Sequence, residues 1–415
     1  MPLRAKVAST VSRTAAALSR AAGRGDGSVI GGWLGLKIDP ELLAHLAAGR
    51  QIALVSGTNG KTTTRLATAA VGVRGEVATN SFGANMPTGH TSALAKAGAT
   101  PYAVLEVDEH YLAQVIAATT PRVVALLNLS RDQLDRAKEV AMMAQLWREA
   151  LRSVTDVAVI ANADDPMVVW AAGTAARVTW FSAGQRWTDD SWVCPECGAH
   201  IAREPQPDGP TGAGGAAWHC TGCALRRPDP QWTVEDEGVV DPHGRWHKVE
   251  LQLPGRVNVG NAATALAVAA EFGIRPEQAV VRLGEVTSVA GRYAQVQRDG
   301  RTIRLLLAKN PASWLEAFDM AAEAPTLLSI NARDPDGLDT SWLFDVDFAP
   351  LRGRDVLITG DRAYDLAVRL EVNAVPFRHV PTLAEAVRTV PPGRLEVIAN
   401  YTAFQDIRAE LDRVL

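Results

Sequence analysis

Three segments of this 415-residue sequence carry side chains whose types and spacing suit chemistry. The first is a glycine turn followed by Lys-Thr, at residues 57–63, which is typical of phosphate binding. The second is a pair of C-x-x-C sequences, which is typical of metal binding. The third, residues 331–347, holds five aspartates with Trp342 and Phe344 among them, and it leaves metal binding, acid–base chemistry and a partner surface open.

The glycine turn follows an apolar run and precedes a helical pattern, in Ile52-Ala-Leu-Val-Ser-Gly-Thr-Asn-Gly-Lys-Thr-Thr-Thr64. Glycines let backbone N–H groups approach phosphate oxygens, and a helix N-terminus adds a positive dipole end. We therefore predict ATP as the ligand, with Lys61 at the β- and γ-phosphates and Thr62 binding Mg²⁺. The predicted phosphate contacts are Gly57, Thr58, Asn59, Gly60, Lys61, Thr62 and Thr63. The alternative is a chance glycine turn before a helix.

A second Mg²⁺ ligand is predicted at Glu106, in Leu105-Glu-Val-Asp-Glu-His110. A carboxylate at the carboxyl end of a parallel strand faces the ligand crevice of an α/β sheet. The neighbouring Asp108 and Glu109 are better explained as the solvated start of a helix.

The cysteines predict a structural zinc site formed by Cys194, Cys197, Cys220 and Cys223. Each C-x-x-C pair can supply two corners of a tetrahedron, and four thiolates leave no open position for catalysis. His200 and His219 lie nearby in sequence but are not needed as ligands. Four reduced cysteines without metal, or a redox role, are the alternatives.

Composition restricts the classes of function. The net charge of −4 argues against bulk electrostatic binding to nucleic acid. No apolar run reaches the roughly 18 residues that a membrane-spanning helix needs. The first 24 residues have five basic residues and no acid, which suits a solvated leading helix, a transit peptide or a helix at an anionic surface. The basic residues are Arg4, Lys6, Arg13, Arg20 and Arg24.

The chain around these segments predicts an α/β protein with parallel, helix-covered sheets. In the central part, apolar runs alternate with helical patterns at Thr63–Val73 and Val140–Arg152. These runs are Ile52–Ser56, Tyr102–Val107, Val123–Leu127, Val157–Ala161 and Val178–Phe181. A helix is expected at about Asn261–Phe272. The alternation of apolar runs and helical patterns starts again at about Arg292. The apolar runs are Ile303–Leu307, Thr326–Ile330, Asp355–Thr359 and Leu395–Ala399. The helical patterns are Ala312–Ala322, Arg362–Leu370 and Leu383–Thr389.

We predict three parts: a basic helical segment at 1–50, a central ATP-binding domain at 51–290 and a C-terminal α/β domain at 291–415. A Trp-, Cys-, Pro- and Gly-rich zinc-ribbon insertion occupies 188–232 of the central domain, with a glycine-rich tip at 209–215.

The compact Gly-Thr-Asn-Gly-Lys-Thr-Thr sequence resembles the Mur ligase family, whose members activate a carboxylate with ATP as an acyl phosphate. Three further segments are similar to that family: Asn85-Met-Pro-Thr-Gly89, Asn128-Leu-Ser-Arg-Asp-Gln-Leu-Asp135 and Gly255-Arg-Val-Asn-Val-Gly-Asn261. The resemblance implies that Asn261 contacts adenine. It also implies a Mur ligase central P-loop domain followed by a smaller α/β domain.

The sequence also departs from the common family pattern. Only some 55 residues precede the phosphate loop, so the usual domain for a UDP-linked precursor is missing. No lysine follows Asp135 at the position that many members carbamylate, and Leu306-Leu-Ala-Lys-Asn-Pro311 replaces a motif containing Asp and His. These features resemble the MurT branch of the family. That branch implies a lipid II substrate, amidation of its D-glutamate α-carboxylate, and a cytoplasmic location with at most peripheral membrane contact.

The aspartate-rich segment then gains an interpretation. Zinc-bound cysteines cannot serve as a glutaminase nucleophile, so ammonia must come from another chain, which the resemblance implies is a GatD-like glutaminase. In that branch the second Asp of Asp-Gly-x-Asp completes the partner's Cys–His pair. The resemblance therefore implies this catalytic role for Asp339. Asp345 and Asp347 are the alternative candidates for the same role. The aromatic residues are interpreted as interface anchors. An amino-acid-adding ligase and a P-loop nucleotide switch with a nucleic-acid-binding zinc ribbon are the rival functions.

Overall fold

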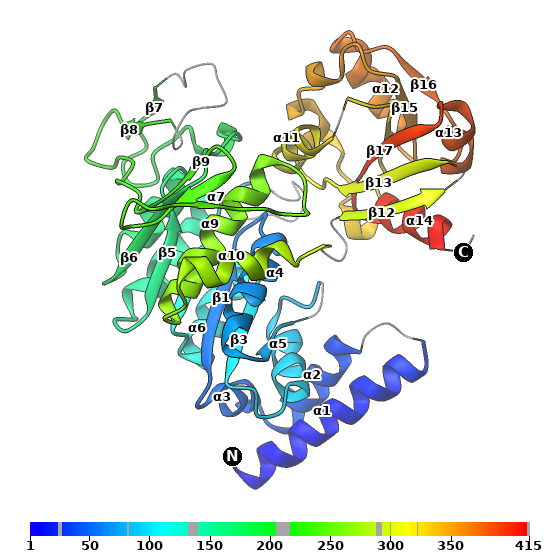
Figure 1. Cartoon of the computed structure of the whole chain (residues 1–415). Helices are drawn as coiled ribbons and strands as arrows, with labels where there is room; N and C mark the ends of the chain where they lie inside the picture. The colour runs from blue at the N-terminus through cyan, green and yellow to red at the C-terminus, as the bar shows by residue number, and fades with distance from the viewer. Residues whose placement is uncertain are drawn as a thin grey trace. The chain divides into compact units, whose positions relative to one another are not determined.

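The computed structural model of the chain describes residues 1–23, 27–80, 83–131, 140–204, 216–287, 293–298, 300–321 and 323–412. These residues form two units, each with its own sheet (Figure 1). Among the described residues, the first unit includes 1–129, 140–252 and 258–287. The second unit includes 130–131, 253–257 and 293–412.

The first unit contains the predicted parallel sheet. Six parallel strands of this sheet run in the order β2-β3-β1-β4-β5-β6, and a seventh, β9 (Trp232–Glu235), follows β6. The strands are β1 (Gln51–Ser56), β2 (Val77–Ala78), β3 (Tyr102–Val107), β4 (Val123–Leu126), β5 (Ala158–Asn162) and β6 (Val178–Ser182). The central strands β1, β4 and β5 are nearly continuous apolar runs because helices cover both of their faces.

Helices alternate with these strands, as the sequence predicts. They are α4 (Lys61–Val71), α5 (Pro87–Lys96), α6 (Leu112–Thr119), α7 (Val140–Arg152), α8 (Pro166–Ala172), α9 (Arg256–Glu271) and α10 (Pro276–Gly284), with short 3-10 helices at Gly72–Arg74, Glu109–Tyr111 and Asp189–Ser191. Three of the helices, α5, α8 and α10, begin with proline, whose missing N–H is harmless at a helix start. Leu112, Trp147 and Val168 bring α6, α7 and α8 into one core with the sheet.

The sheet continues beyond β6 with strands that the sequence analysis did not predict. Strand β9 pairs parallel with β6, and β10 (Gly238–Val240) and β11 (Trp246–Lys248) extend the sheet antiparallel. These strands are only three or four residues long, so they carry little periodic signal. The cysteine insertion holds a separate hairpin of β7 (Ile201–Arg203) and β8 (Trp218–Cys220). Its glycine-rich tip lies outside the described residues.

The N-terminal part of the first unit is helical. It comprises α1 (Leu3–Ala21), α2 (Ser28–Ile38) and α3 (Leu42–Ala47). Within the part of the chain that the structure describes, no helix has both the length and the apolar character needed to cross a membrane.

The second unit is the smaller α/β unit that the sequence predicts. Its sheet order is β12-β13-β17-β14-β15-β16, parallel except for β12. The strands are β12 (Tyr293–Arg298), β13 (Arg301–Leu307), β14 (Thr326–Ser329), β15 (Val356–Thr359), β16 (Phe377–His379) and β17 (Gly393–Ala399). The helices are α11 (Pro311–Met320), α12 (Ala363–Val372), α13 (Leu383–Thr389) and α14 (Tyr401–Asp412), with 3-10 helices at Asp334–Asp336, Ser341–Asp345 and Ala349–Leu351.

Each face of this second sheet has its own core. Leu328 and Ile398 face one core, and their neighbours Leu327 and Val397 face the other, because successive strand residues point to opposite faces. The α/β fold class predicted from the sequence is therefore confirmed in both units.

Candidate nucleotide site and cysteine cluster

The phosphate loop connects the end of β1 to the start of α4. A Cβ atom at Gly60 would lie 2.1 Å from Leu127 Cδ1, and one at Gly57 would lie 2.9 Å from Leu127 Cβ. Gly57 is therefore favoured by the close approach of the segment that follows β4, whereas a side chain at Gly60 would force the end of the Leu127 side chain to move. Among the described residues, no side chain caps the N-terminus of α4, so its first-turn N–H groups suit an anion.

Asn128 holds this loop in place. Its Oδ1 accepts a 2.9 Å hydrogen bond from the N–H of Asn59, and its Nδ2 donates a 2.7 Å bond to the Asn59 carbonyl. Its own carbonyl accepts a bond from the N–H of Thr58. Sequence reasoning noted Asn128 only within a family-like segment, and the remainder of that segment, from residue 132, lies outside the described residues. The sequence signal that could have singled out Asn128 is its position directly after a predicted buried strand.

Glu106 lies beside the loop, in β3, where it pairs in register with Val55 of β1. Its main chain is fixed by Asn80, whose side chain accepts from the Glu106 N–H at 2.9 Å and donates to its carbonyl at 3.0 Å. The same carbonyl lies 2.7 Å from Nε2 of His90, and burial lowers the pKa of His90, which favours the neutral ring. The half-buried Glu106 is thus rigidly placed at the carboxyl end of the sheet.

Asn261 lies on α9 and reaches the first turn of α4. The Thr63 hydroxyl donates a 2.7 Å hydrogen bond to Asn261 Oδ1, and Asn261 Nδ2 donates a 3.1 Å bond to Asn258 Oδ1. Thr63 is buried and Thr62 is half-buried, while the Lys61 side chain lies outside what the structure describes. The structure therefore brings together the phosphate loop and the residue predicted to contact adenine.

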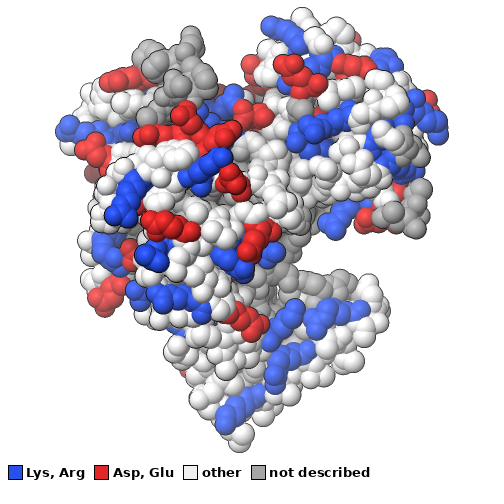
Figure 2. Space-filling view, viewed as in Figure 1, with Lys and Arg blue, Asp and Glu red and all other residues white. Residues whose placement is uncertain are grey.

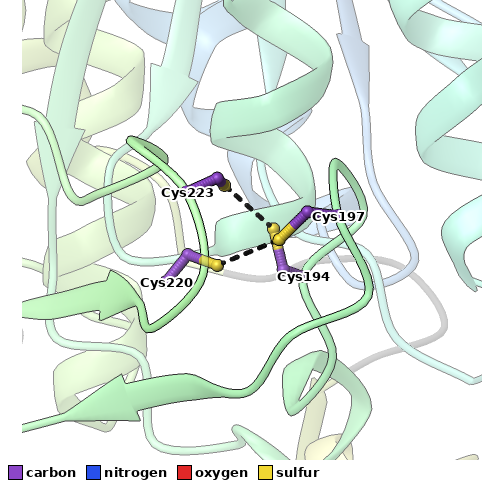
Figure 3. Close-up of side chains that lie close together, drawn as sticks. All are labelled: Cys194, Cys197, Cys220 and Cys223. Carbon is purple, nitrogen blue, oxygen red and sulfur yellow. Dashed lines mark hydrogen bonds between the residues drawn. The ribbon is translucent and has the colours of Figure 1, made fainter.

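The four cysteines come together in one cluster (Figure 3). Their sulfur atoms all lie within 4.8 Å of one another. Cys194 Sγ is 3.7 Å from Cys223 Sγ, and Cys197 Sγ is 3.4 Å from Cys220 Sγ. Tetrahedral Zn–S bonds of about 2.3 Å place sulfur atoms about 3.8 Å apart, so the cluster suits a closed tetrahedral site.

The cysteines also differ electrostatically. Burial raises the pKa of Cys194 to about 12. Burial also acts to raise the pKa of Cys220, but the Gly222 N–H and the neighbouring thiols outweigh it and lower that pKa to about 7. A bound cation would favour the thiolate form of all four residues.

Buried contacts join the insertion to the parallel sheet. The Trp218 indole N–H donates a 3.0 Å hydrogen bond to the carbonyl of Ala163. Arg227 forms a 2.9 Å ion pair with Asp164, and both side chains are largely buried. The sequence analysis did not single out Arg227. Its buried partner could not be inferred because the two residues are far apart in the chain.

The aspartate-rich segment of the second unit divides into residues with different environments. Asp336 accepts a 2.8 Å hydrogen bond from the N–H of Thr402 and also contacts its hydroxyl, which fixes the start of α14. Asp339 is exposed, and its Oδ1 accepts a 2.8 Å bond from the N–H of Ser341. That bond lowers the pKa of Asp339, which keeps the carboxylate ionised.

The competitors of Asp339 have partners of their own. Asp345 forms a 3.3 Å ion pair with Arg131. Asp347 is exposed, and its Oδ1 accepts a 2.9 Å bond from the N–H of Ala349.

The interpretation of both aromatic residues as interface anchors is wrong for Trp342. Its side chain is only 6% exposed and packs in the core, with its ring 6.3 Å from that of Trp314. Phe344 is 75% exposed, which suits an anchor. The five aspartates of this segment suggested a fully exposed surface. The 3-10 helix turns one side of the segment inward, so Trp342 is buried although the aspartates near it are not.

The segment Leu306–Pro311 has a structural role of its own. The Asn310 side chain accepts a 2.9 Å hydrogen bond from the N–H of Ser313, and the Ser313 hydroxyl accepts from the N–H of Asn310 at 3.0 Å. This reciprocal pair is a capping box that starts α11.

Comparison with known proteins identifies the family. Residues 55–193 match the model described as the Mur ligase middle domain, and residues 307–404 match the MurT ligase C-terminal model. The chain is 29% identical to the MurT subunit of lipid II isoglutaminyl synthase (glutamine-hydrolysing) from Streptococcus pneumoniae, over 92% of each chain. It is 28% identical to the Staphylococcus aureus MurT subunit over 95% of each chain. The chain belongs to the Mur ligase family.

Solved structures show the same Mur ligase fold. A pseudomurein peptide ligase type C from Methanothermus fervidus superimposes with a TM-score of 0.67 at 16% identity, covering 91% of this chain and 81% of that one. A MurF structure from Acinetobacter baumannii gives a TM-score of 0.63 at 17% identity, covering 92% and 80%. The resemblance to Mur ligases inferred from the phosphate loop is thus confirmed.

Proposed function

We propose that this chain is the ATP-dependent subunit of a lipid II isoglutaminyl synthase. In this proposal it amidates the α-carboxylate of D-glutamate in the lipid II stem peptide, using ammonia from a GatD-like glutaminase. The similarity to two MurT subunits over nearly the whole chain supports the substrate and the amide donor. The structural observation with most weight is the hydrogen bond between Thr63 and Asn261, because it joins the two segments expected to hold one nucleotide.

The nucleotide would bind along the loop and the first turn of α4. Residues 57–63 would surround the phosphates, Lys61 would neutralise their charge, and Asn261 would contact adenine. Thr62 and Glu106 would hold Mg²⁺, since hydroxyl and carboxylate oxygens are the ligands this hard cation prefers. The family likeness and the uncapped α4 terminus support this arrangement.

The chemistry would proceed in two steps. A carboxylate oxygen of D-glutamate attacks the γ-phosphorus of ATP, giving an acyl phosphate and ADP. Ammonia then attacks the acyl carbon, the C–O bond to phosphate breaks, and the amide and inorganic phosphate are released. Charge on the transferring phosphoryl oxygens is greatest in the first step, so the electrostatic contribution of Lys61 is needed most there.

The ammonia source would be a separate chain. The four cysteines face one another in a cluster that suits structural zinc, which removes them as glutaminase nucleophiles. The exposed, ionised Asp339 is available to orient the partner's catalytic histidine.

A docking surface for that partner is available close to Asp339. Phe344 is exposed, and the guanidinium of Arg369 on α12 lies 4.6 Å from its ring centroid. Tyr364, Val368 and Val372 follow on α12 at four-residue spacing, and all three are exposed. This apolar surface is typical of a protein interface. The complex would act in the cytoplasm, at the inner face of the cell membrane.

The test is reconstitution of the chain with a GatD-like glutaminase, followed by mass spectrometry of lipid II. ATP and glutamine should together add one amide per stem peptide, whereas Lys61→Ala should stay folded and inactive. ATP-dependent amidation that survives in Lys61→Ala would exclude the assigned site. Addition of an amino acid in place of ammonia would identify an amino-acid-adding ligase instead.

A further inference from the structure

The first two helices form a tightly packed antiparallel pair. A Cβ atom at Gly27 would lie 2.4 Å from the Ala16 carbonyl oxygen, and one at Gly31 would lie 2.6 Å from that of Ser12. On its other side, a Cβ at Gly32 would lie 1.7 Å from the carbonyl oxygen of Thr88, in α5. Helix α2 is therefore fixed between α1 and α5 by backbone contacts, and the pair is a rigid part of the first unit.

Both helices of this pair expose large apolar side chains. On α1, Leu3 is 79% exposed, and Val7 and Leu18 are also exposed on the same helical face. On α2, Ile30 and Trp33 are exposed, together with Val29. Soluble proteins rarely collect large exposed side chains on one element without an interaction that covers them.

Basic residues accompany these apolar side chains. Lys6, Arg13 and Arg20 are exposed and recur every seven residues along α1, beside its apolar face. On α2, Lys37 Nζ lies 4.2 Å from the Trp33 ring centroid. Figure 2 shows Lys and Arg side chains along these helices with hardly any acid among them.

The sequence explains why this surface is positively charged. From Met1 to Ile38 it contains six basic residues and a single acid, Asp26. The next acid, Asp39, is buried and pairs with His45 at 3.0 Å. The whole chain has a net charge of −4, so the positive charge of α1 and α2 is local and not a property of the protein surface at large.

We infer that the exposed surface of α1 and α2 is a peripheral membrane-binding surface for anionic phospholipid. We name it the α1–α2 face, defined by Leu3, Val7, Leu18, Val29, Ile30 and Trp33 with Lys6, Arg13, Arg20 and Lys37. Apolar side chains would enter the headgroup–acyl boundary, and each basic residue near an anionic surface adds roughly 1 kcal/mol. Tryptophan favours this interfacial depth because its ring is amphipathic.

This inference deepens the proposed function, because a lipid-linked substrate presents its peptide close to the bilayer surface. A membrane is a better occupant than a second copy of the chain, since two like-charged α1–α2 faces would repel each other. Binding is expected to be reversible and to weaken with salt, since exposed charges are screened within about 10 Å at 0.1 M ionic strength.

The test is co-sedimentation of the full-length chain with vesicles that contain no lipid II. Phosphatidylglycerol–phosphatidylcholine vesicles should bind the wild-type chain, and phosphatidylcholine vesicles should bind it at least tenfold more weakly. The Lys6→Glu/Arg13→Glu variant should lose at least tenfold in affinity, and so should Leu3→Ser/Val7→Ser/Leu18→Ser. The matched control is Arg152→Glu/Arg245→Glu, which reverses two exposed charges elsewhere in the first unit and should bind like wild type.

Several outcomes would overturn the inference. Equal binding by both charge-reversal variants would remove the α1–α2 face as the membrane contact, and so would no binding by the wild type. Self-association without vesicles, abolished by the serine variant, would assign this face to a second copy of the chain. The readout needs neither ATP nor the glutaminase, so its failure is distinct from a failure of the proposed amidation, which is measured separately.

Discussion

The Thr63 hydroxyl donates a 2.7 Å hydrogen bond to Oδ1 of Asn261, although the two residues lie on different helices and are 198 positions apart. A further 3.1 Å bond from Asn261 Nδ2 to Asn258 fixes which way the amide faces. Nδ2 has two hydrogens, so this arrangement leaves capacity for a ligand acceptor.

The first prediction concerns this amide. Asn261→Ala should raise the KM for ATP about fivefold, because one hydrogen bond to a ligand contributes roughly 1 kcal/mol. Thr264→Ala is the control, since its hydroxyl bonds to the Gly260 carbonyl within the same helix, α9. Steady-state kinetics measure both variants. An unchanged KM in Asn261→Ala would remove the adenine contact from the proposal.

The second prediction concerns Asp165, a fully buried carboxylate that accepts hydrogen bonds from the N–H groups of Leu129, Met167 and Val168. Burial raises its pKa from 3.8 to about 6. The folded state therefore holds the proton more tightly than the unfolded chain does. The resulting stability is complete below about pH 4 and is lost as the pH rises through about 6.

A shift of about two pKa units corresponds to roughly 3 kcal/mol. The free energy of unfolding of the wild type, relative to Asp165→Asn, should therefore fall by about that amount between pH 4 and pH 7. Chemical denaturation of both proteins at matched pH measures the difference, and terms common to both cancel. Parallel pH profiles for the two proteins would contradict the raised pKa.

The sequence predicts the parts of the fold whose signals are local. The alternation of apolar runs and helical patterns indicates both α/β units, and the glycine turn indicates the loop before α4. Strands β9, β10 and β11 are not predicted from the sequence, because they are too short to show the alternation of apolar and polar residues that indicates a strand. Residue type alone does not separate Asp336 from Asp339, and the structure adds that Asp336 contacts Thr402 whereas Asp339 is exposed. Such long-range partners depend on the tertiary structure, so the sequence alone does not reveal them.

The third prediction concerns zinc. Freshly purified protein should contain about one zinc ion per chain, because the four sulfur atoms lie at distances that suit a tetrahedral site. Cys197→Ser should lose most of this zinc and lower the melting temperature, since structural zinc contributes to folding directly. His219→Ala is the control and should keep its zinc. Elemental analysis that finds little zinc in the wild type, or equal zinc in both variants, would exclude this metal site.

The fourth prediction separates the two aromatic residues of the aspartate-rich segment. Trp342→Ala should destabilise the second unit by roughly 3–5 kcal/mol, because it removes a large buried side chain. Phe344→Ala should leave stability almost unchanged and weaken binding of the GatD-like glutaminase, since its ring is exposed. Thermal unfolding and partner titration measure the two effects. Tight partner binding by Phe344→Ala would place the interface elsewhere.

The fifth prediction concerns Asp339, whose ionised carboxylate is held by the Ser341 N–H and is exposed to a partner. An amide at this position keeps the shape but cannot stabilise an imidazolium. Asp339→Asn should therefore reduce glutamine-driven amidation by about 10²–10⁴-fold in the reconstituted complex, as loss of a histidine-orienting carboxylate does elsewhere. Amidation driven by free ammonium should survive, because the proposed nucleotide site is formed by residues of the first unit.

Asp347→Asn is the matched control for this experiment. Asp347 is also exposed, and it also accepts a hydrogen bond from a backbone N–H two residues later, so the substitution disturbs the local turn in the same way. It should leave both reactions near the wild-type rate, because the proposal assigns the orienting role to Asp339 and not to its competitor Asp347. Equal rates for Asp339→Asn and Asp347→Asn with glutamine would show that Asp339 orients no histidine. Loss of the ammonium-driven reaction as well, in an intact complex, would point to a defect in this chain's own chemistry.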